Sequence, residues 1–148
     1  MSQRRIYVDT NVLVNYFTKQ ADDVQCLNYL FSKVRKEIFF TSSLAKVQAI
    51  SILQTKKGSR KKFSRAEITD CCNDIDLHFS IIDLTNRDIA KGAQEKSEDL
   101  EDNVHFILAE KLKCDVIITN NTSDFAYFRN RIISLTPRDI GRIRKLVK

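Results

Sequence analysis

The sequence predicts an α/β domain, and three observations favour this class. Short apolar runs rich in β-branched and aromatic residues alternate with longer segments of helical periodicity. This alternation is typical of a mostly parallel sheet with helices on both faces. No linker or internal repeat divides the 148 residues, and a chain of this length buries ~68–70% of its unfolded surface. We therefore expect residues 1–148 to form one domain, a three-layer α/β/α sandwich with a mostly parallel sheet of four to five strands.

The first half of the chain predicts two strands and three helices. IYV (6–8) and EIFFT (37–41) are short apolar runs and predict strands. Residues 21–36 and 42–56 place apolar side chains three and four positions apart, which predicts amphipathic helices. A further helix is expected over 64–75. The apolar face of the second helix is expected to consist of Leu44, Val47, Ile50 and Leu53.

The second half of the chain predicts three strands and two helices. FSIIDL (79–84) and DVIIT (115–119) predict strands, and RIISL (131–135) predicts a weaker fifth. Helices are expected over 86–97 and 100–112. Helix-capping pairs are expected at Ser64 with Glu67 and at Thr85 with Asp88. The inward-facing residues of the last helix are expected to be Leu100, Val104, Ile107, Leu108 and Leu112.

The chain is basic, with a net charge of +6, and its charges are unevenly distributed. KKGSRKKFSR (56–65) holds six basic residues and no acid, whereas EKSEDLED (95–102) holds five acids against one lysine. A basic protein with one concentrated acidic patch suits a polyanionic ligand, with the carboxylates reserved for a metal ion. The alternative is that both runs are solvated loops and helix faces.

Several classes of protein are excluded by the sequence. No apolar run approaches the ~20 residues that span a bilayer, so no membrane segment is expected. Polar residues interrupt the apolar run after MSQRR, which argues against a signal peptide. The cysteines form no CxxC pair, and we expect reduced, mostly buried thiols in a cytoplasmic protein rather than metal ligands. These cysteines are Cys26, Cys71, Cys72 and Cys114.

Polar side chains follow three of the predicted strands. The carboxyl ends of parallel strands meet at one edge of the sheet, where ligands collect. We therefore expect these residues to share one pocket. Ordinary capping of the next helix explains each residue singly, but explains less well why carboxylates cluster. The residues are Asp9, Thr41, Ser42, Thr119, Asn120 and Asn121.

Three aspartates from distant parts of the chain are the leading site candidates. Asp9 ends the first strand, and Asp102 lies in the first turn of a helix, on the same face as Asp99. Asp124 follows a late strand, where it either caps a short helix beginning near Phe125 or points into the pocket. Carboxylates held close repel one another, and Mg²⁺ relieves the repulsion while activating water against a phosphate. This pattern predicts phosphodiester hydrolysis.

Two blocks of the sequence resemble the PIN-domain family. DTNVLVNYF (9–17) is similar to its opening, where the first strand ends in an aspartate followed by a Thr/Ser–Asn pair. DLEDNVHFILAEKLKCDVIITNNTSDF (99–125) is similar to its later block of an acidic pair, a helix, a strand and T-x-N-x-x-D-F. The blocks and the intervening order cover residues 4–136. The resemblance implies a VapC-like toxin: an RNA-cleaving enzyme with Mg²⁺ or Mn²⁺, an antitoxin partner and a homodimer.

The resemblance also assigns roles to individual residues. Asp9, Asp102 and Asp124 match the family's catalytic, metal-binding acids. Asp99 matches a further acid of one PIN branch, although helix capping explains it better. The surrounding residues of the site are expected to be Asn11, Gln48, Asp99 and Asn121. The residues expected to contact RNA phosphates are Lys56, Lys57, Arg60, Lys61 and Lys62.

One position departs from the family pattern. PIN domains usually carry a glutamate in the helix after the second strand, shortly beyond a serine pair. The matching residue here is Gln48, whose amide oxygen can coordinate a cation but brings no charge. Three interpretations stay open: metal binding is weaker but intact, another acid such as Asp99 compensates, or the protein keeps the fold without catalysis.

Other residues favour structural roles. His105 lies one turn from Asp102, and a helix-surface or packing role is favoured over that of nucleophile or general base. Several aromatic residues could stack on bases, but core packing is favoured for each of them. These residues are Tyr16, Phe17, Phe125, Tyr127 and Phe128.

Three functions remain in competition. The leading one is a Mg²⁺- or Mn²⁺-dependent endoribonuclease of PIN type, the toxin of a toxin–antitoxin pair. The second is a catalytically silent PIN-like module that binds RNA or protein, which the Gln48 departure motivates. A receiver-like domain with a Mg²⁺ pocket is disfavoured, because no suitably placed lysine follows a late strand.

Overall fold

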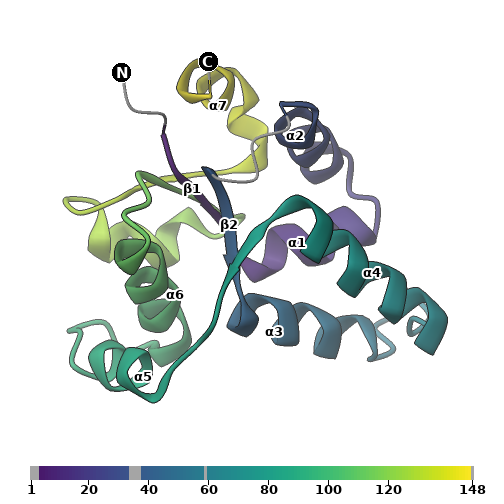
Figure 1. Ribbon diagram of the computed structural model, residues 1–148, viewed down its shortest axis with the longest axis horizontal. Coiled ribbons are helices and arrows are strands. Elements are labelled where there is room, and N and C mark those ends of the chain that lie inside the picture. Colours follow the sequence, from purple (N-terminus) through teal and green to yellow (C-terminus); the bar gives the residue numbers. More distant parts are fainter. Residues whose placement is uncertain (1–3, 34–37, 59, 148) are drawn as a thin grey trace.

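A computed structural model describes residues 4–33, 38–58 and 60–147 of the protein. Five strands form one sheet in the order β3-β2-β1-β4-β5, and every neighbouring pair is parallel (Figure 1). The predicted strands are confirmed, although most are shorter than their apolar runs, and Glu37 lies outside the described residues. The strands are β1 (Ile6–Val8), β2 (Phe39–Ser42), β3 (Ser80–Ile82), β4 (Val116–Ile118) and β5 (Ile133–Leu135).

Helices connect the strands and close the chain. Both predicted capping boxes are present, at the starts of α4 and α5. Four predicted helices end earlier than expected, and α4 runs on to His78. Residues 34–36 of the first predicted helix lie outside the described residues. The α-helices are α1 (Thr10–Phe17), α2 (Ala21–Ser32), α3 (Ser43–Leu53), α4 (Arg65–His78), α5 (Asn86–Ala93), α6 (Leu100–Lys111) and α7 (Ile140–Leu146). The 3₁₀ helices are η2 (Thr122–Phe128) and η3 (Pro137–Asp139).

The sequence pattern predicts neither α1 nor α7. The run after Asp9 is rich in β-branched and aromatic residues, which favour strands. It is nevertheless helical, because Asp9 caps it and its apolar side chains pack on both the sheet and α3. Tertiary contacts have overridden local propensity here.

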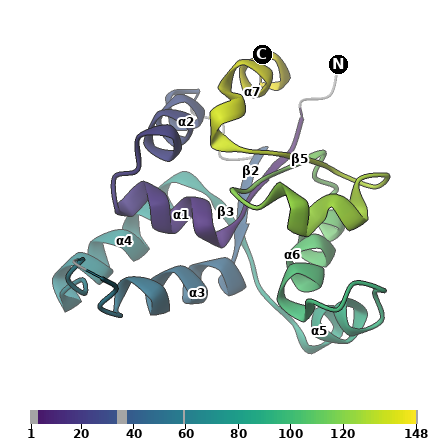
Figure 2. The ribbon, with the colours of Figure 1, turned by 180° about the vertical axis from the view of Figure 1, so that it is seen from behind.

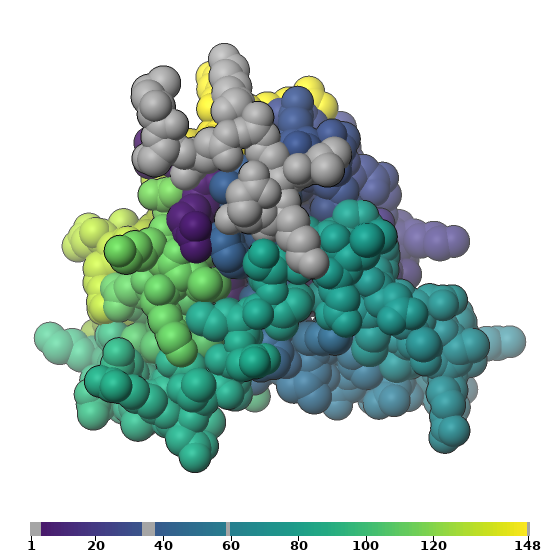
Figure 3. Space-filling view, viewed as in Figure 1, coloured from purple at the N-terminus to yellow at the C-terminus, as the bar shows by residue number. Residues whose placement is uncertain are grey.

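The sheet separates two apolar cores, which makes the three predicted layers. Alternate side chains of each strand point to opposite faces. Ile6 and Val8 pack with α1, α2, α4 and α7, whereas Tyr7 packs with α6 and η2. Figures 1 and 2 show α5 and α6 on one side of the strands and α1, α2 and α4 on the other. In the space-filling view the segment from β3 to α5 crosses the front between these two sides (Figure 3).

Two helix faces differ from the expectation. Val47 was expected in the core but its side chain is 61% exposed, because α3 packs through the small residues Ala45 and Ala49. Leu100 is 46% exposed, since it is the first residue of α6 and lies beyond the packed part of that helix. The error for Val47 arises because apolar residues spaced three and four apart leave the exact buried face of a helix undecided.

Helices α5 and α6 pack very closely. A methyl group on Gly92 would lie 2.7 Å from Val104 Cγ2 and 3.3 Å from the Val104 backbone nitrogen. Asn103 reinforces this contact, because its side-chain amide donates to the carbonyl oxygens of Gly92 and Ser97. The start of α6, which carries Asp99 and Asp102, is therefore held against α5.

Two further sequence expectations concern cysteines and membranes. All four cysteines are free thiols; Cys26, Cys71 and Cys114 are buried, as expected. Burial raises the pKa of Cys26 and of Cys114 to about 12. Within the described part of the chain, no helix has the length and apolar character needed to cross a membrane.

Candidate active site

The candidate site lies where the order of the strands reverses. β1 is followed along the chain by β2 on one side, whereas β4 lies on its other side. Connections leaving β1 and β4 therefore diverge, and such a switch point opens a crevice at the carboxyl ends of the strands. Asp9 directly follows β1, and Thr119 directly follows β4.

Asp9 is the buried anchor of this crevice. It is only 5% exposed, and its Oδ1 accepts a hydrogen bond of 2.8 Å from the Thr10 backbone N–H. Its Oδ2 accepts hydrogen bonds from Thr119 Oγ1 at 2.8 Å and from Asn11 Nδ2 at 3.2 Å. The residue thus caps α1 and joins the ends of two strands, which satisfies the charge that a buried carboxylate carries.

A second layer of polar residues supports Asp9. Asn11 Oδ1 accepts a hydrogen bond of 2.9 Å from the Asn120 backbone N–H. Asn120 Nδ2 in turn donates to Asp23 Oδ2 at 2.8 Å, and burial raises the pKa of Asp23. The sequence pattern did not single out Asp23, because an acid in the first turn of a helix is commonplace.

A cavity of about 400 Å³ opens above Asp9 and gathers the predicted residues. Asp102 reaches it from α6 and Asp124 from η2, so all three candidate acids border one space. Gln48, Asn11 and Asn121 also line it, as predicted. The complete lining is Asp9, Thr10, Asn11, Gln48, Ser51, Ile52, Glu101, Asp102, His105, Asn121 and Asp124.

The acids influence one another electrostatically. Burial raises the pKa of Asp102 to about 7, and the negative charges of Asp99, Asp124 and Asp9 contribute to the rise. Asp99 lies outside this cavity and caps α6, since its Oδ1 accepts the Asp102 backbone N–H at 3.0 Å. The capping role favoured for Asp99 is therefore confirmed.

Asp124 differs from one of the two placements expected for it. The 3₁₀ helix begins at Thr122 and its N-cap residue is Asn121, so Asp124 lies inside the first turn rather than at the cap. Its side chain borders the cavity instead. The helix begins three residues before Phe125 because Asn121 leaves the strand direction and its carbonyl accepts the Asp124 N–H.

The donor atoms suit a hard divalent cation in kind, though they are not assembled as a closed cage. Among the described residues, no three His, Cys, Asp or Glu side chains converge closely enough to hold a metal ion. Mg²⁺ commonly takes one or two carboxylates and keeps several waters. Asp9, Asp102 and Asp124 offer oxygen ligands around one cavity, so they fit such a partly hydrated ion.

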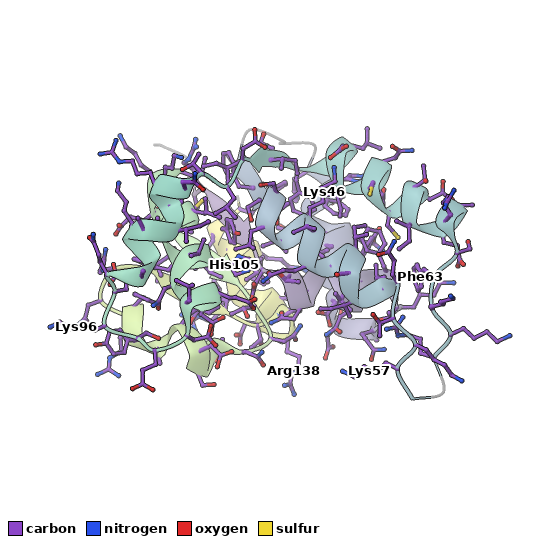
Figure 4. All side chains as sticks on the ribbon, turned by 90° about the horizontal axis from the view of Figure 1, so that it is seen from below. Lys46, Lys57, Phe63, Lys96, His105 and Arg138 are labelled. Carbon is purple, nitrogen blue, oxygen red and sulfur yellow. The ribbon has the colours of Figure 1, made fainter. Side chains whose placement is uncertain are left out.

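His105 occupies the centre of the site and was not among the predicted site residues. Its side chain lies between α6 and α3 when the strand ends are viewed directly (Figure 4). It is 2% exposed, its Nε2 lies 3.6 Å from Asp9 Oδ1, and burial lowers its pKa. Of the two structural roles expected for His105, the helix-surface position is therefore wrong and the packing role is confirmed. The spacing of three residues from Asp102 was the available signal, because it places both on one face of α6.

A second cavity of about 620 Å³ continues the groove past the acids. It shares Asp102 and Asp124 with the first cavity and adds Tyr127, Arg129 and Asn130. Tyr127 is 55% exposed, so the core-packing expectation is wrong for it. That expectation is confirmed for Phe125 and Phe128, which are buried, and Tyr16 and Phe17 pack against the core as half-buried side chains.

The predicted basic residues lie apart from both cavities. They form the loop between α3 and α4, at the far end of α3 from the strands, where Lys57 is seen in Figure 4. Arg60 is half-buried and donates to the carbonyl oxygens of Ile52 and Thr55, both at 3.2 Å. Arg60 thus holds the loop against α3. The lysines of this basic loop are exposed: Lys56, Lys57, Lys61 and Lys62.

Comparison with solved structures identifies the fold. A structure of FitAB bound to the IR36 DNA fragment matches with a TM-score of 0.65 and 17% identity, over 90% of this chain and 95% of that chain. VapBC2 from Rickettsia felis, bound to a promoter DNA fragment, matches with a TM-score of 0.61 and 12% identity, over 88% and 97%. VapC20 of Mycobacterium tuberculosis, described as a sarcin–ricin loop cleaving toxin, matches with a TM-score of 0.59 and 12% identity, over 86% and 96%.

These comparisons confirm the expected PIN-like α/β/α fold. At such identities the likeness establishes the fold that the proteins share. No protein-family model matches the sequence, and no curated protein matches it. The function of the site must therefore be argued from its own residues.

Proposed function

We propose that this protein is a metal-dependent endoribonuclease of PIN type, which hydrolyses RNA phosphodiesters with Mg²⁺ or Mn²⁺. The observation that carries this proposal is the meeting of Asp9, Asp102 and Asp124 in one cavity at the switch point of the sheet. Burial raises the pKa of Asp102, and the negative charges of Asp99, Asp124 and Asp9 add to the rise, so the acids crowd negative charge into this cavity. A cation would relieve that excess, and a phosphate could approach only after it is relieved.

Each residue then has a definite task. A bound Mg²⁺ or Mn²⁺ supplies an activated water and neutralises charge on the phosphate. Asp9, fixed by Thr119 and Asn11, offers a carboxylate that does not need to reorganise. Asp102 and Asp124 complete the acidic wall and orient water molecules around the phosphate. His105 packs as a buried side chain beside Asp9, with its Nε2 3.6 Å from Asp9 Oδ1.

The surroundings of the cavity suggest a path for a single RNA strand. Tyr127 offers an exposed ring for base stacking on one side of the acids, with Arg129 next to it for a phosphate. On the other side, Ser51 and Ile52 of α3 line the cavity, and α3 leads to the basic loop. The strand would cross the acids between these two regions.

We further propose that the protein is the toxin of a toxin–antitoxin pair, acts in the cytoplasm and forms a homodimer. The pairing is supported by the FitAB and VapBC2 complexes that the fold resembles, whereas the cytoplasm and the homodimer are carried over from the PIN resemblance. An antitoxin would need to bring a basic group to the acidic cavity, because that group would replace the cation there.

The proposal is tested by cleavage of a mixed RNA pool in Mn²⁺ by the wild-type protein, Asp9→Asn and Asp102→Asn. We expect metal-dependent cleavage by the wild type and its loss in both variants. Folding of each variant is checked by circular dichroism. Cleavage that persists in both folded variants would refute the assignment of these acids.

A catalytically silent PIN-like module that binds RNA or protein is the second candidate. The observation that favours it is Gln48, a neutral residue in the wall where the PIN pattern has a glutamate. This candidate expects no cleavage by the wild type and no Mn²⁺ binding by calorimetry. It also expects Asp9→Asn to leave the cellular effect of the protein unchanged.

A further inference from the structure

We infer that Gln48 provides a hydrogen-bond donor site for a phosphate oxygen of the substrate, and that its amide oxygen is not a metal ligand. This inference rests on the proposed function, because it concerns the RNA that enters the acidic cavity. A glutamate at this position would offer a negative charge to the cation. Gln48 would instead offer an N–H donor to the anionic substrate.

The orientation of the Gln48 amide follows from a chain of buried hydrogen bonds that begins at a backbone group. Ser42 Oγ accepts the Ala45 backbone N–H at 3.0 Å, and Ser42 is fully buried. A buried hydroxyl hydrogen needs an acceptor. Among the described residues, Tyr7 Oη at 2.7 Å is the partner left for it. Ser42 therefore donates to Tyr7.

The same direction of hydrogen-bond donation continues through the rings of Tyr7 and His105. The Tyr7 hydroxyl has a single hydrogen, which it donates to His105 Nδ1 at 2.7 Å. Because Nδ1 accepts, the hydrogen of the neutral imidazole resides on Nε2. His105 Nε2 donates to Gln48 Oε1 at 2.8 Å. A protonated ring would donate from Nε2 as well, so the Gln48 orientation does not depend on the charge of His105.

Thr10 supplies the second donor to the oxygen that His105 orients. Its hydroxyl donates to Gln48 Oε1 at 2.7 Å, so the amide oxygen already accepts two hydrogen bonds within the protein. An amide oxygen has two lone pairs, and both are then occupied. A cation would have to displace Thr10 or His105 to use this oxygen. The carbonyl end of Gln48 is thereby withdrawn from metal binding.

The amide nitrogen of Gln48 is left facing the cavity. It has no hydrogen-bond partner among the described residues, yet it is not a buried unpaired atom, so it reaches solvent. Gln48 lines the same cavity as the three aspartates. An N–H donor beside acceptor-only carboxylates recognises an oxygen that the carboxylates themselves repel, and a phosphate oxygen of RNA is such a group.

The test measures RNA binding and metal binding separately. A labelled single-stranded RNA of mixed sequence is titrated by fluorescence anisotropy in Ca²⁺, and Mn²⁺ binding is measured by calorimetry without RNA. Gln48→Met removes both amide groups without adding charge, and Gln48→Glu replaces the donor by an acceptor oxygen and adds a negative charge. Gln25→Glu, at an exposed position of α2, is the control for added charge.

We expect both Gln48 variants to raise the Kd for RNA about 10-fold or more, since a hydrogen bond to a charged group is lost. Gln48→Met should leave the Kd for Mn²⁺ unchanged, and Gln25→Glu should change RNA binding little. In the wild type, the side-chain ¹⁵N–¹H₂ signals of Gln48 should shift when RNA is added. These signals are assigned by their absence in Gln48→Met.

The opposite pattern overturns the inference: weaker Mn²⁺ binding by Gln48→Met, with RNA affinity and the Gln48 amide signals unchanged. Binding is read without cleavage, so the two proposals fail separately. A wild-type protein that cleaves no RNA but shows the Gln48-dependent binding would retain the donor site and refute the nuclease. A protein that cleaves RNA, but whose RNA binding does not depend on Gln48, would retain the nuclease and refute the donor site.

Discussion

At the scale of single residues, two acids of one cavity have different surroundings. Asp9 accepts hydrogen bonds from Thr119, Asn11 and a backbone N–H, so its charge is stabilised by donors. Asp102 is desolvated and lies in the field of three other acids, and its pKa rises to about 7. Ionisation of Asp102 therefore opposes folding of the metal-free protein.

This difference predicts that Asp102→Asn stabilises the metal-free protein, and that the stabilisation depends on pH. The carboxyl of Asp102 has a higher pKa in the folded state than the ordinary 3.8, so the folded protein holds the proton more tightly. Stability of the metal-free protein consequently falls as pH rises from about 4 to about 7. In EDTA, Asp102→Asn should raise the melting temperature at pH 8 and change it less at pH 4.5.

Asp22→Asn, an exposed acid of α2, is the control for a lost charge and should show no comparable pH dependence. An equal effect of Asp102→Asn at both pH values would contradict the origin assigned to the shift. Adding Mn²⁺ should stabilise the wild type more than Asp102→Asn, if the cation binds this acid.

The buried chain that orients His105 makes a second prediction at this scale. Tyr7→Phe leaves both Ser42 Oγ and His105 Nδ1 without their 2.7 Å partner. Unpaired buried polar groups cost about 1–3 kcal/mol, so the free energy of unfolding should fall by about that amount in urea titrations. Tyr127→Phe removes the same hydroxyl from an exposed ring and should be nearly neutral. Equal effects of the two variants would contradict the hydrogen-bond chain.

At the scale of elements, the contact between α5 and α6 sets the position of the acidic wall. Asp99 and Asp102 belong to the start of α6, and this start is fixed because Gly92 allows α5 to approach Val104 closely. A glycine within a helix normally costs stability relative to alanine. Here the close approach of α5 to α6 that Gly92 allows outweighs the low helix propensity of glycine.

Gly92→Ala should therefore destabilise the protein, although alanine favours helices. The new methyl group would lie 2.7 Å from Val104 Cγ2 and 3.3 Å from a backbone nitrogen, which cannot yield easily. Overpacking of this kind costs about 1–3 kcal/mol, measurable by urea denaturation. Gly141→Ala in α7 is the matched control: nothing lies within 4 Å of its added methyl group, so it should stabilise slightly. Stabilisation by both changes would show that α5 and α6 are less tightly packed.

At the scale of the whole molecule, charge is divided between two regions. Three acids border the cavity at the carboxyl ends of the strands, and four exposed lysines lie in the basic loop beyond α3, where Figure 4 labels Lys57. Separation of this kind allows a polyanion to be attracted at one place while its phosphate reacts at another. Arg60 holds the loop in place and so contributes structure rather than free charge.

Replacement of the four exposed lysines of the basic loop by glutamine tests this division. Binding of RNA should weaken for all sequences, and the slope of log Kd against log salt should become flatter. The substitutions spare Arg60, so the loop keeps its anchor on α3. A control protein carries the same number of Lys→Gln changes on other faces. An unchanged salt slope would remove the basic loop from the proposed RNA path.

The sequence by itself determined the class of the fold and much of its local structure. Apolar runs marked the five strands, and capping boxes marked the starts of α4 and α5. These signals are local, since a strand or a cap is encoded by neighbouring residues. The carboxylates of Asp9, Asp102 and Asp124 were also identified in the sequence, because polar residues at strand ends and helix starts of a parallel sheet must lie near one edge.

Only the tertiary structure decided how these residues meet. His105 is buried at the centre of the site, Tyr127 is exposed, and the amide oxygen of Gln48 accepts hydrogen bonds from His105 and Thr10. None of these outcomes is encoded locally. Each depends on groups that come from distant segments, such as the buried chain from β2 through β1 and α6 to α3. Burial, hydrogen-bond direction and the raised pKa of Asp102 arise only when those segments are packed together.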